Sequence, residues 1–381
     1  MNTKKIHIPP IDFAAPITAL IVELERVREK YSHGTTPEAL FLELKEMFQF
    51  FTAIISARIE GNHTTVIDVI DALNEAEDQG ISTPEDVREI ENIQAGIDFI
   101  EANVHDSPID KAFILELHRI VVNDLRREGD GRVGGWRTVP VHIAGSDHIA
   151  PQPSDIDDHM QELVGFINTD HGTQYDLIKD AIVHHRFVWI HPFGNGNGRV
   201  ARLLTYAMMA KQGFIDSTGI RTLNPTAVFG SNREDYYNHL AQADSLKDAD
   251  ILAWSEFMLH GVQEDLTSIG KLQDVRFVRR QILIPAFRDA ADAGRITEQQ
   301  FAMLRIVINK DRVKAGDFSK IITGSHAARS QAVRKLVEAR LLRVNKTGRF
   351  YSLRLSPNNV TRFIRQQLDA QGLLPQALKD D

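Results

Sequence analysis

The sequence predicts a mainly α-helical protein with two short β-hairpins. Apolar side chains recur three and four residues apart along most of the 381 residues, which is the period of an amphipathic α-helix. Alternation of apolar and polar residues is confined to residues 131–153 and 341–355, and each of these stretches contains a turn sequence. A chain of this length is also long enough for two or three domains with cores of their own.

The composition is that of an ordinary globular protein, with 25% charged and 43% hydrophobic residues. The absence of cysteine excludes disulfides and thiolate metal sites. Residues 1–12 lack the apolar segment of a signal peptide, and no apolar run reaches the roughly 18 residues that a membrane span needs. We therefore expect a cytoplasmic protein that is not bound to a membrane.

Five helices are expected in the first 213 residues. The Thr-Pro pair at 36–37, the Ser-Pro pair at 107–108 and Ser154 are typical helix starts. Residues 177–189 are apolar throughout and predict a buried helix, and the next helix ends at Gly213.

The C-terminal part is predicted to contain three helices followed by a hairpin. The helices are expected around residues 301–308, 313–322 and 325–339, and the hairpin turns at residues 346–348. This order resembles a winged helix-turn-helix, a fold that places one helix in the major groove of DNA.

This part of the chain is also strongly basic. Residues 312–354 contain eleven basic and two acidic residues, a net charge of +9, whereas the whole chain has a net charge of −8. Such a block suits a polyanion. We therefore expect DNA contacts from Arg329, Ser330 and Arg334 on the third helix and from Arg349 in the hairpin, with a protein-binding winged helix as the alternative.

The most informative motif surrounds His191. This histidine precedes a Gly/Asn turn at residues 194–198, and the helix that follows carries Arg199 and Arg202. A turn of this kind directs backbone N–H groups and the positive end of a helix dipole toward an anion such as phosphate. Arginines three residues apart on that helix can add charge-assisted contacts. A base beside a phosphate cradle indicates group transfer from a nucleotide.

The run from His191 to Arg202 also resembles the motif of the Fic (Fido) family, H-P-F-x-(D/E)-G-N-G-R-x-x-R. The matching residues are His191, Pro192, Phe193, Gly196, Asn197, Gly198, Arg199 and Arg202. Asn195 departs from the motif, since the family usually has at this position an acidic residue that holds Mg²⁺. The resemblance covers residues 10–262 and implies a Fic helical core.

This resemblance implies a protein adenylyltransferase, which moves AMP from ATP to a Ser, Thr or Tyr hydroxyl of a protein target. His191 would be the catalytic base. The resemblance assigns ATP binding to Gly196, Asn197, Gly198, Arg199, Arg202, Tyr236 and Tyr237, with Asp244 as a weaker candidate. Mg²⁺ would be held by the phosphates and weakly by the Asn195 amide oxygen, because a hard cation prefers a carboxylate.

A second motif lies upstream, where residues 56–61 read S-A-R-I-E-G. This run resembles the inhibitory motif of the same family, (S/T)-x-x-x-E-(G/N), and places Ser56 and Glu60 in it. The resemblance implies that Glu60 pairs with Arg202, which would otherwise bind the γ-phosphate of ATP. The alternative is an unremarkable pair of polar residues on a helix surface.

The hairpin expected within residues 131–153 corresponds to the flap of the family. There Val139, Val141, His142 and Ile143 would align a target segment by strand addition. Without the resemblance it would be an ordinary surface hairpin.

The predicted organisation has five parts. These are an N-terminal helical region (1–106), a Fic core (107–262), a linker helix (263–293), a winged helix-turn-helix (294–357) and a tail (358–381). Two other functions stay open, namely a DNA-binding regulator whose core senses nucleotide, and an enzyme that also removes AMP by using Glu60 to position water. A homodimer also stays open.

Overall fold

The computed structural model describes residues 5–30, 34–143, 145–214, 229, 233–345, 347–374 and 378. Ala144 and Lys346, in the two predicted turns, lie outside the described residues. The α-helices are α1 (Pro16–Lys30), α2 (Glu38–Ile59), α3 (Val66–Gln79), α4 (Glu85–Asn103), α5 (Lys111–Val121), α6 (Ile156–Asn168), α7 (Asp176–Ile190), α8 (Asn197–Lys211), α10 (Arg233–Ala243), α11 (Asp248–Gly270), α12 (Val275–Phe277), α13 (Ile284–Asp292), α14 (Glu298–Lys310), α15 (His326–Glu338) and α16 (Thr361–Ala370). The strands β1 (Leu342–Val344) and β2 (Tyr351–Leu353) form the one sheet assigned within these ranges.

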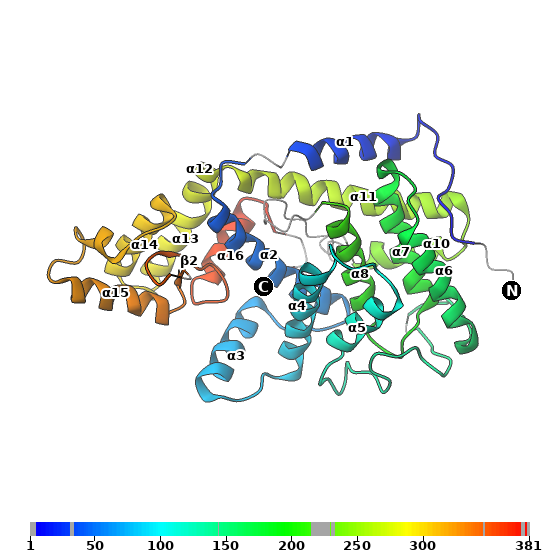
Figure 1. Cartoon of the computed structure of the whole chain (residues 1–381), viewed down its shortest axis with the longest axis horizontal. Helices are drawn as coiled ribbons and strands as arrows, with labels where there is room; N and C mark the ends of the chain where they lie inside the picture. Colours follow the sequence, from blue (N-terminus) through cyan, green and yellow to red (C-terminus); the bar gives the residue numbers. More distant parts are fainter. Residues whose placement is uncertain are drawn as a thin grey trace.

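Helices α7 and α8 form the centre of the molecule. They pack against each other, α4 and α5 cover α8, and α6 and α11 cover α7 (Figure 1). Nearly all residues of α7 are buried, as the apolar run at 177–189 predicts. The next helix, α8, ends as expected at Gly213, whose positive φ of 80° suits glycine. No helix in the described ranges is long and apolar enough to cross a bilayer.

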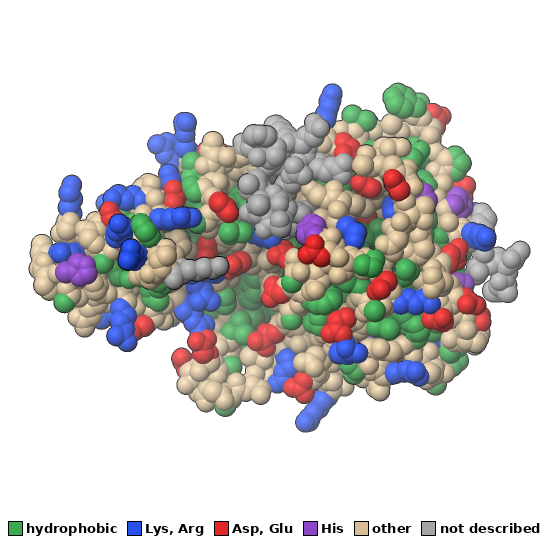
Figure 2. All heavy atoms as spheres, viewed as in Figure 1, with side chains coloured by type: hydrophobic (Ala, Val, Ile, Leu, Met, Phe, Trp, Pro, Cys, Tyr) green, Lys and Arg blue, Asp and Glu red, His purple; other side chains and the backbone are tan. Residues whose placement is uncertain are grey.

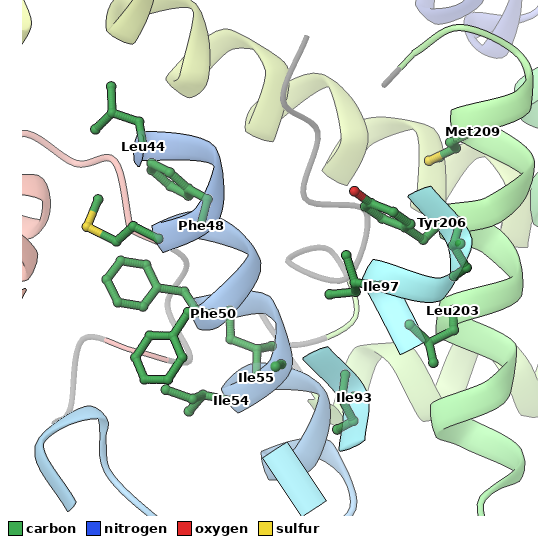
Figure 3. Packing of buried hydrophobic residues seen from close by; sticks show 14 of the residues in the cluster. Leu44, Phe48, Phe50, Ile54, Ile55, Ile93, Ile97, Leu203, Tyr206 and Met209 are labelled. Carbon is green, nitrogen blue, oxygen red and sulfur yellow. The ribbon is translucent and has the colours of Figure 1, made fainter. Parts of the chain in front are cut away.

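Helix α2 crosses this bundle and is buried along most of its length. It packs against α4 and α8, where Ile93, Ile97 and Leu203 lie across from it, whereas Phe48 and Phe50 of α2 point to the opposite side (Figure 3). A buried polar network adds to this packing, because the Glu101 carboxylate of α4 is 2.7 Å from the Lys45 ammonium of α2 and 2.7 Å from the Tyr206 hydroxyl of α8. The network fixes α2 against the two helices that lie beside the His191 motif.

Three predicted helix starts need correction. The Thr36 hydroxyl donates to the carbonyl oxygen of Leu272 instead of capping α2, which begins at Glu38. Helix α5 begins three residues after Pro108, where Asp110 accepts from the Phe113 N–H. Ser154 lies within a 3₁₀ turn before α6 and does not cap it. Thr36 does not cap α2 because its side chain makes a tertiary contact, and α5 starts later than predicted because Asp110 is its cap.

The C-terminal unit comprises α13 to α16 with the antiparallel pair β1–β2, in the register Leu342–Leu353 to Val344–Tyr351. Helices α14 and α15 and the hairpin are found where the sequence predicts them. The helix predicted at 313–322 is only a 3₁₀ turn, Ala315–Phe318, because Val313 forms a β-bridge with Tyr351. Residues 358–374, expected to be a tail, contain α16, which packs on α13.

The C-terminal unit is joined to α2 and α3 by ion pairs. Arg343 of β1 contacts Glu43 at 3.1 Å and Glu46 at 2.6 Å, and Arg340 pairs with Glu77 of α3. The Leu355 N–H donates to the Glu43 carboxylate at 2.9 Å. Burial raises the pKa of Glu43 to about 7, although the Arg343 charge acts in the opposite direction. Two arginines of the basic block therefore bind acidic residues of this same chain.

Candidate active site

The turn between α7 and α8 is built by the residues of the His191 motif. Helix α7 ends at His191, whose φ of 50° is left-handed, and Pro192 prevents the helix from continuing. The Asn197 side chain closes the turn, since it accepts from the Phe193 N–H and donates to the Phe193 carbonyl, both at 2.9 Å. Gly196 caps α8 with a φ of 77°. The N-terminus of α8 thus lies directly beside His191.

His191 has the protonation state that a general base needs. Its Nδ1 lies 3.3 Å from the Val188 carbonyl oxygen, which can only accept, so Nδ1 carries the proton and Nε2 keeps its lone pair. Burial lowers the pKa of His191 to about 4, so the ring is neutral at pH 7. The geometry of the turn and the tautomer of the ring agree with the expected catalytic role.

Phe193 anchors this turn to the core. Its ring is fully buried and stacks on His118 with a centroid distance of 3.7 Å and an interplanar angle of 6°. The other side of the motif is held by Asp130, whose carboxylate accepts from the Asn195 N–H at 3.0 Å and lies 3.4 Å from His118 Nε2. Neither His118 nor Asp130 was identified from the sequence, because both are remote from the motif and isolated in the chain.

The structure brings together Glu60 and Arg202, the two residues of the expected inhibitory contact. Glu60 lies at the end of α2, and its Oε1 is 2.6 Å from Arg202 Nη2. Ser56 also accepts two hydrogen bonds from Arg202. Its hydroxyl oxygen lies 2.8 Å from Arg202 Nε, and its carbonyl oxygen lies 2.9 Å from Arg202 Nη2. Burial by itself would raise the pKa of Glu60, but the charges of Arg202 and Arg199 outweigh it and lower that pKa. Glu60 is therefore ionised and paired at neutral pH.

Gly198 makes this pairing sterically feasible. A Cβ atom at position 198 would collide with the Glu60 carboxylate and would lie 3.1 Å from Arg202 Nη1. Glycine is needed here for close approach, since the residue lies within the first turn of α8.

Arg199 faces the protein interior, with 1% of its side chain exposed. Its guanidinium lies 3.1 Å from the Glu89 carboxylate of α4 and donates to the Glu128 carbonyl at 2.9 Å. Glu89 also accepts from Asn62 at 2.9 Å, which ties the turn after Glu60 to the same cluster. Sequence reasoning missed Glu89, because nothing in its own segment distinguishes it from a surface glutamate.

Asn195 does not present a metal site of its own. Its amide oxygen accepts from the Gly196 N–H at 2.6 Å and from Arg199 Nη2 at 3.3 Å, so the oxygen is directed into its own turn. Within the described ranges no group of three or more His, Asp or Glu side chains could hold a metal ion. The side chains described therefore do not form a resident Mg²⁺ site.

The two tyrosines of α10 are placed differently. Tyr236 is buried in the core, where its hydroxyl is 3.0 Å from His184 Nε2 and its ring packs on Trp254. Tyr237 is 43% exposed and Arg233 lies over its ring. The core packing of Tyr236 is the structural role that aromatic residues on a helix usually have.

Asp244 belongs to a different cluster from the motif. It lies 3.0 Å from His185 Nε2 and 3.9 Å from His148 Nδ1. It therefore connects α7 to the segment that was expected to be the flap. The weak assignment of Asp244 to an ATP pocket has no support in these contacts.

The predicted flap is not a β-hairpin. Residues 131–143 and 145–153 contain no strand, so the expected β-hairpin is not found there. The docking of a target segment by Val139, Val141, His142 and Ile143 stays a prediction. Val139 is 62% exposed. Exposed and partly buried residues alternate from residue 145 to residue 150, and no partner strand completes a ladder there.

The residues expected to contact DNA lie at the far end of the molecule, where Lys and Arg side chains gather around α14 and α15 (Figure 2). Arg334 and Arg349 are exposed, and Arg334 pairs with Glu338 at 2.8 Å. Arg329 and Ser330 are partly buried, and Arg329 donates to the Gly324 carbonyl at 2.8 Å.

Comparison with known proteins connects this geometry to a family. Residues 108–209 match the model of the Fic/DOC family, and this range contains the whole motif from His191 to Arg202. Over this range the chain is similar to the Fic/DOC family. It is 33% identical over 132 residues to a protein named protein adenylyltransferase Fic from Nematostella vectensis, a match that covers 34% of this chain and 28% of that protein. A relative of the same name from Drosophila virilis is 26% identical over 249 residues, which cover 65% of this chain and 48% of the relative.

Solved structures share the fold. A Fic family protein from Desulfovibrio desulfuricans has a TM-score of 0.56 at 21% identity, covering 91% of this chain and 98% of that structure. Fic-1 from C. elegans has a TM-score of 0.51 at 22% identity, covering 68% of this chain and 73% of that structure. The chain spans less than half the length of the two curated relatives described above, and the structure from Desulfovibrio desulfuricans matches it well beyond residues 108–209.

Proposed function

We propose that this protein is an adenylyltransferase that moves AMP from ATP, taken up with Mg²⁺, to a Ser, Thr or Tyr hydroxyl of a protein target. The observation that carries the proposal is the position of His191, a neutral imidazole with an unprotonated Nε2 at the N-terminus of α8. Relatives with the name protein adenylyltransferase support the same reaction.

In the proposed reaction, His191 Nε2 accepts the proton of the target hydroxyl as its oxygen attacks the α-phosphorus of ATP. A new P–O bond forms to the target, the bond between the α-phosphorus and the bridging oxygen breaks, and pyrophosphate leaves. The N-terminus of α8 and the Gly196–Gly198 segment would stabilise the developing charge through backbone N–H groups. Asn197 acts indirectly, since both ends of its amide are occupied in closing the turn.

The Glu60–Arg202 pair makes the described state an inhibited one. Arg202 is the guanidinium that would bind the terminal phosphates, but Glu60 and Ser56 occupy it. The Glu60 carboxylate also repels a phosphate placed beside it. Activation in this proposal requires Glu60 to leave Arg202.

Mass spectrometry of the full chain with ATP and Mg²⁺ tests the activity. ATP labelled in its α-phosphate reports AMP transfer to the chain itself or to proteins of a cell extract. Glu60→Gly should transfer AMP, and the double variant Glu60→Gly with His191→Ala should not. If the double variant is as active as the single one, His191 is not the base and the proposed mechanism is wrong.

The exposed basic residues of the C-terminal unit favour a second function, binding of duplex DNA by a winged helix. The observation behind it is the exposure of Arg334 and Arg349 on α15 and the hairpin. Affinity of the full chain for a mixed-sequence duplex should fall steeply as salt rises, since phosphate contacts release counterions. Arg334→Gln with Arg349→Gln should weaken binding, whereas Arg276→Gln on α12 is the control. An undetectable interaction at low salt would leave protein contacts as the role of this unit.

A further inference from the structure

Residues 137–143 and 145–151 are two chain segments near His191 that form no β-ladder with each other. The Arg137 side chain connects the two segments instead. Its Nη1 donates to the Val139 carbonyl at 3.0 Å and its Nη2 to the Pro151 carbonyl at 2.6 Å. One guanidinium therefore holds together two backbone positions that are twelve residues apart in the chain.

The same guanidinium also holds the catalytic turn. Arg137 Nε donates to the His191 carbonyl at 2.8 Å, and the Arg137 backbone N–H donates to the Pro192 carbonyl at 2.9 Å. All three side-chain nitrogens of Arg137 are thus used on three carbonyl groups. The segment and the base share one residue as their common support.

Burial makes this arrangement specific to arginine. Only 4% of Arg137 is exposed, and a buried charge is costly unless its donors are satisfied. The planar guanidinium presents N–H donors in three fixed directions, whereas a lysine ammonium is a compact group on a flexible stem. A lysine at position 137 would keep the charge but could not reach all three carbonyls.

A second contact fastens the segment to the same helix end. His148 Nε2 donates to the Trp189 carbonyl at 2.7 Å, one turn or less before the end of α7. The described residues between Arg137 and His148 are largely exposed, including Val139. The anchors therefore fix the base of the segment and leave its middle open to a partner.

We propose that Arg137 is a positioning residue that aligns the segment at 137–151 with the His191 turn, so that a bound target hydroxyl and the base meet in one geometry. The inference rests on the proposed AMP transfer for the role of His191. The contacts of Arg137 do not depend on that activity and can be tested without it.

Two variants separate charge from geometry. Arg137→Ala removes both the charge and the three donors. Arg137→Lys keeps the charge but loses the planar arrangement of three donor nitrogens. Arg132→Ala is the matched control, because Arg132 is an exposed arginine in the same loop. Circular dichroism identifies the variants that fold, and Arg137→Lys, which keeps the charge and part of the contacts, serves if the alanine variant does not.

Hydrogen exchange and histidine titration then test the proposal in the absence of substrate. The hydrogen-bonded amides of residues 137, 146 and 148 should exchange at least tenfold faster in both Arg137 variants than in the parent. Burial and the Arg137 charge both lower the pKa of His191, so NMR titration should show it raised in Arg137→Ala and less changed in Arg137→Lys. Parental exchange and parental titration in a folded Arg137 variant would overturn the proposal.

Transfer kinetics in the Glu60→Gly background give the functional readout. Both Arg137 variants should raise KM for the protein target and lower kcat, with KM for ATP little changed, since Arg137 contacts the segment and the turn but not the N-terminus of α8. Equal loss in all three parameters would indicate a general structural defect and overturn a positioning role. If the background itself transfers no AMP, the proposed function fails while the exchange and titration results still decide the role of Arg137.

Discussion

The Glu60 carboxylate of α2 and the Arg202 guanidinium of α8 form an ion pair at 2.6 Å, although they are separated by 142 residues in the sequence. The Arg202 side chain is 1% exposed and the Glu60 side chain is 27% exposed. The arginine is therefore almost fully desolvated, whereas the glutamate keeps part of its contact with solvent. Ser56, one helical turn before Glu60, completes the enclosure of the arginine. While this ion pair is formed, Glu60 and Ser56 occupy the Arg202 guanidinium.

Glu60→Gly should raise the initial rate of AMP transfer. Removing one partner of a buried charge pair typically changes a site by about 2–5 kcal/mol, and the partial exposure of Glu60 places the gain toward the lower end, at about ten- to hundredfold. Arg202→Ala should abolish transfer with or without Glu60, because the same arginine is the proposed phosphate ligand. The two substitutions should therefore be strongly non-additive.

The matched control for this cycle is Glu38→Gly, an exposed glutamate in the first turn of the same helix. It should leave the transfer rate at the parental level. A Glu60→Gly protein no more active than the parent, on itself and on several targets, would leave Glu60 without an inhibitory role.

The acid limb of the pH–rate profile should lie well below the ordinary histidine range. Burial lowers the pKa of His191 to about 4 from 6.5, so the base stays neutral down to about pH 5. In the Glu60→Gly background the limb should move further toward acid, because the Glu60 charge raises that pKa. The measurement is kcat/KM from pH 4.5 to 8, with circular dichroism to exclude unfolding. A limb between pH 6 and 7 would mean that His191 is solvated in the active enzyme.

Asn195→Asp should lower the Mg²⁺ concentration for half-maximal transfer. One carboxylate oxygen can keep the contact with the Gly196 N–H, and the other adds the charged ligand that a hard cation prefers. The measurement is an Mg²⁺ titration at fixed ATP in the Glu60→Gly background, with Asn309→Asp on α14 as the control. The same Mg²⁺ dependence in both variants would show that position 195 does not contact the ion.

Glu43→Gln should change how stability depends on pH. Burial raises the pKa of Glu43 from 4.5 to about 7, so the folded state holds its proton more tightly than the unfolded state does. The resulting stabilisation is complete below pH 4.5 and is lost as the pH rises through 7. Relative to the parent, the glutamine variant should gain about 1–3 kcal/mol between pH 5 and pH 8.

Thermal unfolding at the two pH values measures this gain, and Glu38→Gln, an exposed residue in the first turn of the same helix, is the control. A relative loss for Glu43→Gln at pH 8 would show that the ion pair with Arg343 outweighs burial.

Much of the helical architecture could be predicted from local signals. The buried run at 177–189, the end of α8 just before Gly213 and the presence of a helix around residues 301–308 follow from apolar period and glycine placement. Predictions failed where a tertiary partner changed the local outcome. Val313 was predicted to begin a helix, but its backbone pairs with Tyr351, and the stretch at 131–153 alternates without a strand to pair with.

The candidate site was predictable to the extent that its residues are contiguous in the sequence. His191, Arg202 and Glu60 belong to two recognisable motifs, and the structure brings them together. Arg137 and Asp130 could not be found this way, because an isolated arginine and an isolated aspartate have no pattern of their own. Their roles depend on a fold that brings them against the carbonyl and amide groups of the turn.

Helix α2 is unbroken from Glu38 to Ile59, and its two ends serve different parts of the molecule. Glu43 binds the C-terminal unit, and the far end delivers Ser56 and Glu60 to Arg202, roughly 25 Å away along the same rigid rod. A shortened protein without the C-terminal unit would uncover the apolar flank of this rod and leave Glu43 without Arg343 and Leu355. Under the proposed function, rates measured on such a fragment would reflect an altered Glu60–Arg202 contact, so AMP transfer has to be assayed with the C-terminal unit attached.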